Sequence, residues 1–251
     1  MMLTMVAEEE EIQYHSDIYS FNASVVAHPT NSSLGYGDRD TGSDVFRMIQ
    51  RFLNNEKSTV CGSIIYVLAK RYPNEENVSN LIAQLRANHV FVYFIVHTVS
   101  SGGLYTQPLF DMSSRTNGFC IFMGTRNYWV VVDNGIAVLY RPYQYLAKNY
   151  VVSGQRRLEI PSFKTPSTKP YSEQDMVVIT VQDHGNYTFT GPDSENGWPR
   201  FGSGIIAQPN FNGLVEYKLT IDYNYASNQS QDIEVRMYSN WYHDFLPFAS
   251  N

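Results

Sequence analysis

Short apolar runs alternate with amphipathic segments over residues 61–122. The run 63–68 is a continuous apolar segment, which is typical of a strand buried on both faces of a sheet. Apolar residues then recur at helical spacing at Val78, Leu81, Ile82 and Leu85. A second apolar run at 89–97 predicts another buried strand. Because the order is strand, helix, strand, helix, strand, the pattern predicts parallel strands in an open α/β sheet.

The same periodicities extend this pattern on both sides. Helices are predicted at 44–54, 107–115 and 141–148, and a strand is predicted at 119–123. Two further segments, 12–26 and 129–139, fit a helix or a strand equally well.

The pattern changes near Tyr150. From there apolar and polar residues alternate with period two, and Gly, Pro, Asn and Asp interrupt them at short intervals. Such alternation is typical of antiparallel strands joined by turns, and the spacing favours a small β-sandwich. The predicted fold class is therefore α/β plus all-β, with an α/β domain at 1–149 and an antiparallel β-sandwich at 150–251.

Composition narrows the functional classes. The chain has 251 residues, of which only 17% are charged, and a net charge of -6 with a pI near 5.5. Binding to a phosphate backbone requires clustered Lys and Arg, so this composition argues against a nucleic-acid partner. No apolar stretch reaches the roughly 18–20 residues that span a bilayer. The first residues, MMLTMVAEEEEIQ, lack the basic start and long apolar core of a signal peptide, which predicts a cytosolic chain.

Other features indicate secretion instead. Acceptor sequences for N-glycosylation occur at Asn22, Asn31, Asn77, Asn186 and Asn228. The two cysteines, Cys61 and Cys120, permit one disulfide in a secreted protein, although two free thiols are equally ordinary. The conflict between the N-terminus and the rest of the chain suggests that an upstream portion carried by relatives is missing here.

Several blocks of sequence carry a resemblance to a known family. They are GSDVFRMIQRFLNN, CGSIIYVLAKRYPNEENVSNLIAQLRANHVFVYFIV, SGGLYTQPLFDMSSRTNGFC, and YQYLAKNYVVSGQRRLEIP with VVITVQDHG. In this order they resemble the C-terminal half of a von Willebrand factor A domain. They are most similar to a group of nematode proteins in which a degenerate A-like domain precedes a β-sandwich. The resemblance covers about residues 35–190 and implies a truncated, Rossmann-like parallel sheet in a protein whose full-length relatives are secreted.

An intact A domain implies a metal-ion-dependent adhesion site, in which Asp, Ser and Thr oxygens bind a cation such as Mg²⁺. Here the first strand and its Asp-x-Ser-x-Ser loop are missing, and Thr41 matches the threonine position only loosely. Ala69-Lys70-Arg71 stands where the last aspartate belongs, and two cationic side chains repel a metal ion. We therefore expect no metal and no cofactor. Loss of the central strand also implies an open sheet edge. Residues 12–26 or a partner chain would cover it, or the sequence is an incomplete gene product.

No complete catalytic set is recognisable in the sequence. Asp183 and His184 follow a predicted strand and would suit an acid and a base, but no Gly-x-Ser-x-Gly elbow accompanies them. Cys61 lies at the start of its predicted strand, whereas the active edge of an open α/β sheet lies at the carboxyl ends of the strands. The histidines show no zinc-ligand spacing. We therefore predict that the chain is not an enzyme.

The loops that follow the three predicted parallel strands share the carboxyl edge of the sheet. Their polar residues Tyr72, Asn74, Ser101 and Thr125 are the candidate binding residues. The leading hypothesis is a non-enzymatic extracellular binding or adhesion module that acts without a metal and takes a protein or glycan ligand. Two alternatives stay open: a hydrolase-like enzyme that uses Asp183 and His184, and a truncated paralogue with little function of its own. The oligomeric state stays open as well.

Overall fold

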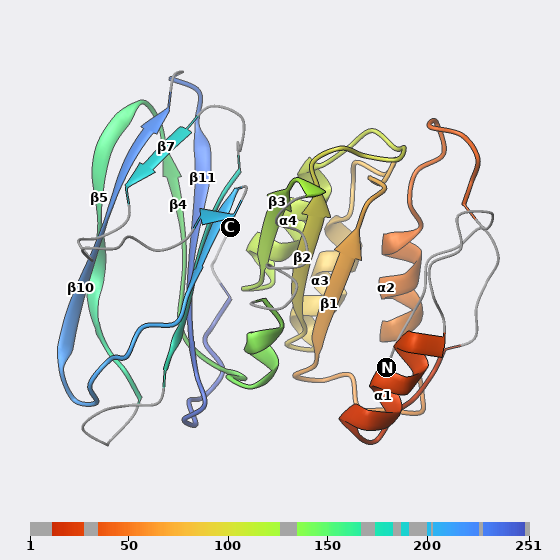
Figure 1. Cartoon of the computed structure of the whole chain (residues 1–251), viewed down its shortest axis with the longest axis horizontal. Helices are drawn as coiled ribbons and strands as arrows, with labels where there is room; N and C mark the ends of the chain where they lie inside the picture. The colour runs from red at the N-terminus through yellow and green to blue at the C-terminus, as the bar shows by residue number, and fades with distance from the viewer. Residues whose placement is uncertain are drawn as a thin grey trace.

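The computed structural model describes residues 12–27, 35–125, 135–166, 174–182, 187–190, 200–201, 203–225 and 228–248. These residues form a parallel three-stranded sheet with helices, followed by two antiparallel sheets. Figure 1 shows the two parts side by side, with the antiparallel sheets on the left and the parallel sheet on the right. The chain is thus mixed α/β with a sandwich-like pair of sheets, as the sequence pattern predicts.

The parallel part alternates helices with strands. Its elements are α2 (Val45–Leu53), β1 (Ile64–Ala69), α3 (Ser79–Ala87), β2 (Phe91–His97), α4 (Gln107–Arg115) and β3 (Phe119–Met123). The strand order is β1-β2-β3, and both pairs are parallel. These bounds confirm the helices and strands predicted between residues 44 and 123.

The two ambiguous segments both contribute helical structure. The first overlaps α1 (Ile18–Ala27), and the second ends in the short 3-10 helix η3 (Ile136–Leu139). Residues 129–134 of the second segment lie outside the described ranges.

β1 is an edge strand, and its burial differs from the expectation. β2 and β3 are buried along almost their whole length, whereas only Ala69 is fully buried in β1 and Leu68 is 41% exposed. The strand predicted at 63–68 therefore exists, but the prediction that both of its faces are buried is wrong. An apolar run does not reveal whether its strand lies at the centre or the edge of a sheet.

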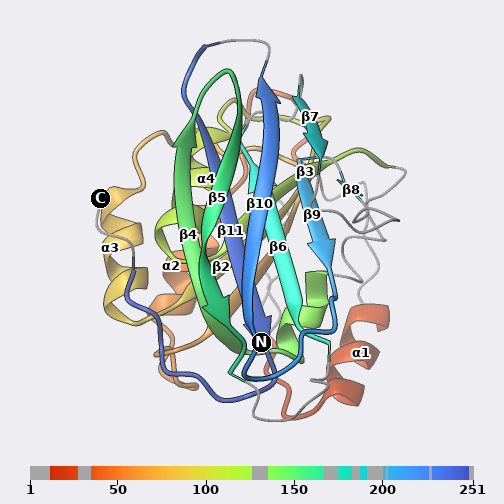
Figure 2. The ribbon, with the colours of Figure 1, turned by 90° about the vertical axis from the view of Figure 1, so that its left-hand side faces the viewer.

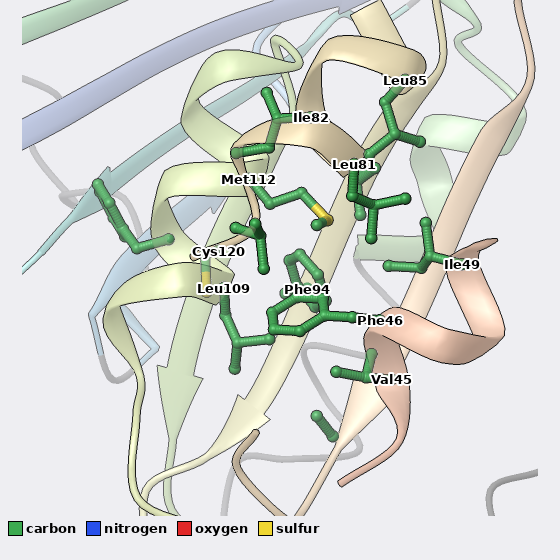
Figure 3. Close-up of a cluster of buried hydrophobic side chains, with 14 of the residues drawn as sticks. Val45, Phe46, Ile49, Leu81, Ile82, Leu85, Phe94, Leu109, Met112 and Cys120 are labelled. Carbon is green, nitrogen blue, oxygen red and sulfur yellow. The ribbon is translucent and has the colours of Figure 1, made fainter. Parts of the chain in front are cut away.

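The helices cover one face of the parallel sheet (Figure 3). Their inward side chains and those of the strands form one apolar cluster. The cluster includes Val45, Phe46 and Ile49 of α2, Leu81, Ile82 and Leu85 of α3, Leu109 and Met112 of α4, Phe94 of β2 and Cys120 of β3. The apolar spacing that predicts α2 and α3 thus also supplies the core beneath them.

The second part consists of two antiparallel sheets that enclose an apolar core. Its strands are β4 (Tyr143–Val152), β5 (Gln155–Lys164), β6 (Met176–Val181), β7 (Tyr187–Thr190), β8 (Arg200–Phe201), β9 (Gly204–Ala207), β10 (Glu216–Tyr225) and β11 (Gln231–Ser239). One sheet has the order β4-β11-β6-β9-β8, and the other has the order β5-β10-β7. Alternate side chains such as Ile179, Ile221 and Val235 fill the space between the sheets.

The helix predicted at 141–148 is wrong, because most of this segment belongs to β4. Its inward residues Tyr143, Tyr145 and Leu146 fit a helical stripe when the segment is read alone. In the folded chain β4 pairs with β11 along its whole length, so long-range pairing decides the conformation. The predicted division between residues 149 and 150 consequently falls inside this strand.

The central strands of the five-stranded sheet are buried on both faces. Along β6 and β11, one set of alternate side chains enters the sandwich core, and the other set faces the parallel sheet. In β6, for example, Val177 and Ile179 belong to the first set, and Met176 and Val178 belong to the second. The five-stranded sheet therefore covers the face of the parallel sheet that the helices leave open.

An apolar layer fills the seam between the two parts. It comprises Phe91, Tyr93 and Ile95 of β2, Phe119, Ile121 and Met123 of β3, Ala137 and Val138 of η3, and Met176, Val178, Ile206 and Tyr238 of the five-stranded sheet. The sheets approach so closely that a Cβ added at Gly204 would lie 2.9 Å from the Ile121 side chain. The two parts thus share a buried layer of side chains.

Two oppositely charged side chains of β11, Arg236 and Glu234, are buried in the same seam. The Arg236 guanidinium donates hydrogen bonds to the carbonyl oxygens of Gly118 (2.7 Å) and Lys148 (2.8 Å) and to Asn149 Oδ1 (2.6 Å). Its Nη2 atom lies 3.6 Å from Glu234 Oε1. Both residues are 0% exposed, so this ion pair joins β11 to β4 and to the start of β3 away from water.

The backbone of β3 on its outer edge is hydrogen-bonded to polar groups of the sandwich. The Cys120 amide donates to Glu234 Oε2 (3.4 Å), and the Phe122 amide donates to Ser203 Oγ (2.8 Å). The Ser203 amide donates in turn to the Phe122 carbonyl oxygen (2.8 Å). Unpaired backbone groups on a buried strand edge are costly, so these bonds allow the parallel sheet to end inside the protein.

Removing the cation from this seam should destabilise the whole chain. The variant Arg236→Met keeps a long side chain but removes the cation beside the Glu234 carboxyl and the donor to the carbonyl oxygens of Gly118 and Lys148. We expect the free energy of unfolding, measured by urea denaturation, to fall by about 3–5 kcal/mol. Arg157→Met is the matched control, because the exposed pair of Arg157 with Asp222 contributes at most about 1 kcal/mol. Equal losses in the two variants would contradict the structural role of the seam.

Two buried carboxyl groups predict that acid stabilises the fold. Burial raises the pKa of Glu234 to about 7 and the pKa of Asp175 to about 6, although Asp175 accepts a hydrogen bond from the Tyr145 hydroxyl (3.1 Å). Both folded-state pKa values exceed those of the unfolded chain, so protonation favours the folded state. This contribution is complete below the ordinary carboxyl pKa values and is lost as the pH rises through about 6 and about 7.

The free energy of unfolding should therefore rise as the pH falls from about 8 to about 5 at fixed ionic strength, as measured by urea titration. Glu234→Gln should remove the rise between about pH 7 and about pH 6 and make the rise below about pH 6 shallower, because only Asp175 then contributes to it. A free energy that decreases over the same interval would show that the two carboxyl groups are not held in this environment.

Candidate functional site

Four loop segments meet at the carboxyl edge of the parallel sheet, which lies at the top of Figure 1. Three of them follow β1, β2 and β3, and the fourth precedes α2. Backbone hydrogen bonds join them, because the Ser43 amide donates to the Tyr72 carbonyl (2.8 Å) and the Gly103 amide donates to the Arg39 carbonyl (3.0 Å). The loops therefore form one connected surface.

Tyr72, the first candidate binding residue, braces these loops from within. Its hydroxyl donates to the carbonyl oxygens of His97 (3.0 Å) and Thr98 (3.1 Å) at the end of β2. Its amide donates to the carbonyl oxygen of Gly102 (2.9 Å). The ring is half-buried and packs edge-on against Phe122, and burial raises the pKa of the phenol. Tyr72 thus holds the loop after β2 in place, and its polar atoms already have protein partners.

Arg71 lies next to Tyr72 and fixes the loop before α2. Its guanidinium donates to the carbonyl oxygens of Asp38 (2.7 Å) and Thr41 and stands 5.1 Å from the centroid of the Tyr36 ring. A Cβ at Gly102 would lie 2.0 Å from Arg71 Nη1, so the glycine leaves room for this side chain. The positive charge that the sequence places after β1 therefore cross-links neighbouring loops.

Thr41, which loosely matches the threonine of a metal-ion-dependent adhesion site, takes part in a turn with Asp38. The Asp38 carboxylate accepts hydrogen bonds from the amides of Asp40 (2.9 Å) and Thr41 (2.7 Å) and from Thr41 Oγ1 (2.9 Å). The bond from the Thr41 amide contributes most to holding the pKa of Asp38 below its usual value. Thr41 therefore serves the turn. Among the described residues, no group of three or more His, Cys, Asp or Glu side chains is arranged to hold a metal ion.

The other three candidate residues, Asn74, Ser101 and Thr125, are exposed at this edge. Asn74 Nδ2 donates to the Asp40 carbonyl (2.7 Å), and Ser101 Oγ donates to the Lys70 carbonyl (3.4 Å). Thr125 Oγ1 lies 2.9 Å from His97 Nε2, which brings it to the far side of the same surface. The structure thus brings all four predicted residues to one edge, and each has at least one polar contact within it.

The Ser100–Gly103 loop is not open for an anion. The Ser101 amide donates to the Lys70 carbonyl (2.9 Å), and the Gly102 amide donates to Ser100 Oγ (3.0 Å). The Gly103 amide is bonded to Arg39, as described above. A phosphate-binding loop needs amides that point at the ligand, so this loop is a structural turn.

Two apolar residues of this edge were missed by the sequence reasoning. Val99 is 63% exposed and Leu104 is 66% exposed, and both flank the glycine-containing loop after β2. Their position beside the Ser100–Gly103 loop could have predicted their exposure, because loop tips lie at the surface. Val and Leu are usually buried, so residue type alone did not predict this exposure.

The cysteines are both free. Cys61 is exposed before β1, whereas Cys120 is buried in β3, where burial raises the pKa of its thiol well above the usual value. β2 lies between β1 and β3, so these two strands are separated by about 10 Å. A disulfide needs Cα atoms within about 7 Å, and the disulfide considered from the sequence is therefore not formed.

The remaining site predictions divide between described and undescribed residues. Asp183 and His184, and the acceptor asparagines Asn31 and Asn186, lie outside the described residues. The other three acceptor asparagines, Asn22, Asn77 and Asn228, are exposed. Within the described ranges, every helix is too short or too polar to cross a membrane.

Comparison with known sequences gives one family match. Residues 148–240 are similar to the family described as Domain of unknown function (DUF7154). This match runs from the second half of β4 to the end of β11, and so covers the sandwich but not the parallel sheet. No match was found among curated proteins.

Among solved structures, the chain is similar to human COPII-coat protein Sec24c, with 8% identity and a TM-score of 0.37 over 94% of this chain. The chain spans only 35% of the length of that protein. It is also similar to a de novo designed double-stranded β-helix, with 17% identity and a TM-score of 0.19 over 37% of this chain and 97% of the design. At these TM-scores neither likeness bears on the fold or the function.

The close packing at the carboxyl edge predicts a difference between two glycines. A Cβ at Gly103, where φ is +80°, would lie 1.8 Å from the Tyr72 carbonyl oxygen, whereas one at Gly37, where φ is +73°, has nothing within 4 Å. Gly37→Ala should therefore cost only the left-handed strain of about 1–2 kcal/mol. Gly103→Ala should cost at least about 2 kcal/mol more, because backbone must move.

Urea denaturation measures both costs, and amide exchange at Tyr72 reports whether the loop has opened. Exchange at Tyr72 should accelerate in Gly103→Ala and stay unchanged in Gly37→Ala. Similar costs and similar exchange in the two variants would show that the loops are not braced against each other.

Proposed function

We propose that the chain is a non-enzymatic binding module that contacts its ligand through the carboxyl-edge loops. One observation carries this proposal: Arg71 and Tyr72 fix the loops from inside, and the fixed loops present Val99 and Leu104 to solvent. Preformed loops lose little conformational entropy when a partner binds, and exposed apolar side chains between polar groups suit a contact surface.

The same hydrogen bonds argue against catalysis at this edge. A general base or nucleophile needs a polar atom free to meet the substrate. The Tyr72 hydroxyl donates to two carbonyl oxygens, and Thr125 Oγ1 lies within hydrogen-bonding distance of His97. The polar groups of the edge thus hold the loops together, and the proposed contact is made without a bridging metal.

A protein ligand fits this surface better than a glycan. Val99 and Leu104 are aliphatic, whereas sugar rings are usually held against aromatic faces. Exposed side chains of both signs, Asp40, Arg39 and Lys70, lie on the loops that are bonded to the Ser100–Gly103 loop, and they would form the polar rim of the contact. A glycan ligand is the second outcome that the test below can return.

An extracellular, adhesion-type role is part of the proposal. The sequence resemblance to a von Willebrand factor A-like domain supports it, as does the surface position of three acceptor asparagines, Asn22, Asn77 and Asn228. These positions accept a glycan without disturbing the core, because none of them packs inside it.

A screen of protein and glycan arrays with the full chain tests the proposal. Once a ligand is found, Val99→Asp or Leu104→Asp should weaken binding by about ten-fold or more, because each charge enters the apolar part of the contact. Val151→Asp is the matched control: Val151 is 72% exposed on β4, outside the loops, and its variant should bind like the wild type.

Three results would overturn the proposal. They are binding that the loop variants leave unchanged, binding that Val151→Asp weakens equally, and binding that disappears with a chelator. The last result would refute the metal-free contact in particular.

A further inference from the structure

The residues after β11 return to the amino edge of the parallel sheet. β11 ends at Ser239, and residues 240–248 continue without helix or strand. Figure 2 shows this segment leaving the sandwich at the bottom and ending beside α3, which belongs to the parallel part. We call residues 240–248 the C-terminal tail.

Two phenylalanines anchor the C-terminal tail on residues of the parallel part. Phe245 and Phe248 each stack on the imidazole of His89, with ring centroids 5.5 and 5.6 Å apart and interplanar angles of 21° and 19°. Each also contacts Phe91, at 6.0 and 6.4 Å. The guanidinium carbon of Arg86 lies 5.0 Å from the centroid of the Phe248 ring. We call Gly62, Arg86, His89 and Phe91 the aromatic seat.

The backbone of the aromatic seat is shaped for these rings. Gly62 has a φ of +73°, and a Cβ there would lie 3.0 Å from Phe245 Cζ. His89 has a φ of +49°, a conformation that non-glycine residues adopt at a cost. Two left-handed residues thus present the seat to Phe245: Gly62 adopts this conformation without strain, whereas His89 adopts it at a cost.

Residues 242–248 contact the parallel part and β4 through aromatic rings, those of Tyr242, Phe245 and Phe248. Among the described residues, no backbone–backbone hydrogen bond joins 242–248 to the rest of the chain. The side-chain hydrogen bonds of Tyr242 and His243 go only to Asp244 inside the tail. Phe245 is 58% exposed even though it contacts the seat. Segments with few backbone bonds and exposed side chains open at low free-energy cost.

We propose that the aromatic seat is a docking site for a Phe-x-x-Phe segment, and that a second copy of this chain can supply the segment by exchanging its tail. The seat already holds Phe245-Leu246-Pro247-Phe248, and a second copy carries the same four residues. Exchange of identical elements needs no new contact, only an opened hinge between Ser239 and Phe245. The proposal concerns the amino edge of the sheet and is independent of the binding surface at the carboxyl edge.

The first experiment measures docking in trans. The full-chain variant Phe245→Ala/Phe248→Ala frees the seat, and a fluorescent peptide of residues 241–248 is titrated into it by anisotropy. Saturable binding is expected. The wild type should bind the same peptide at least about ten-fold more weakly, because its own tail competes at an effective concentration in the millimolar range.

Controls assign the binding to the rings. A peptide with both phenylalanines replaced by alanine should not bind. His89→Asn, added to the freed-seat variant, removes the stacked ring while keeping a residue that tolerates a left-handed backbone, and it should also abolish binding. Circular dichroism of each variant checks that the fold is kept. Equal affinity for the freed-seat variant, the wild type and His89→Asn would overturn the proposal, as would no saturable binding.

The second experiment tests exchange between copies. Phe245→Ala/Phe248→Ala has a seat but no tail anchors, and His89→Asn alone has tail anchors but an impaired seat. A mixture should form a heterodimer in sedimentation velocity, whereas each variant alone should not. Peptide binding without a heterodimer would refute the second copy as the occupant and point to another Phe-bearing protein.

Discussion

A buried ion pair, Arg236 with Glu234, joins the two parts of this protein. Arg236 reaches from the seam face of β11 to the carbonyl oxygen of Gly118 before β3, and Glu234 accepts a hydrogen bond from the amide of Cys120, two residues further on. A parallel sheet of three strands would otherwise expose the backbone of β3 to an apolar seam. The ion pair and its neighbours meet that need, so the helical part and the sandwich are stable as one unit.

A second arginine, Arg71, donates hydrogen bonds to backbone carbonyl oxygens at the carboxyl edge. The guanidinium of Arg71 binds carbonyl oxygens of the loop before α2, as that of Arg236 binds carbonyl oxygens at the seam. A planar guanidinium carries five donors in a fixed fork, so it can satisfy several carbonyl groups from one position. At the surface the result is a set of loops with a fixed shape, and at the seam it is a closed sheet edge.

The helices and parallel strands were predictable because their signals are local. α4 and β3 begin and end at the predicted residues, since Pro108 near the helix start and the Thr116-Asn117-Gly118 turn mark their ends in the sequence. β4 was not predictable in this way, because its pairing with β11 involves residues about 90 positions away. Among the candidate site residues, the sequence located Tyr72 at the correct edge but could not show that its hydroxyl faces inward to His97.

By itself the sequence determined which segments between residues 44 and 123 are helices and which are strands, and the edge at which their loops gather, because periodicity and strand direction follow from local chemistry. Only the tertiary structure decided which polar groups are hydrogen-bonded within the protein and which surfaces are exposed. Charged residues are usually exposed, yet Glu234 and Arg236 are both 0% exposed. Phe245 and Phe248 belong to no periodic pattern in the sequence, yet they stack on His89. Both outcomes depend on contacts between distant segments, and such contacts leave no periodic signal in the chain.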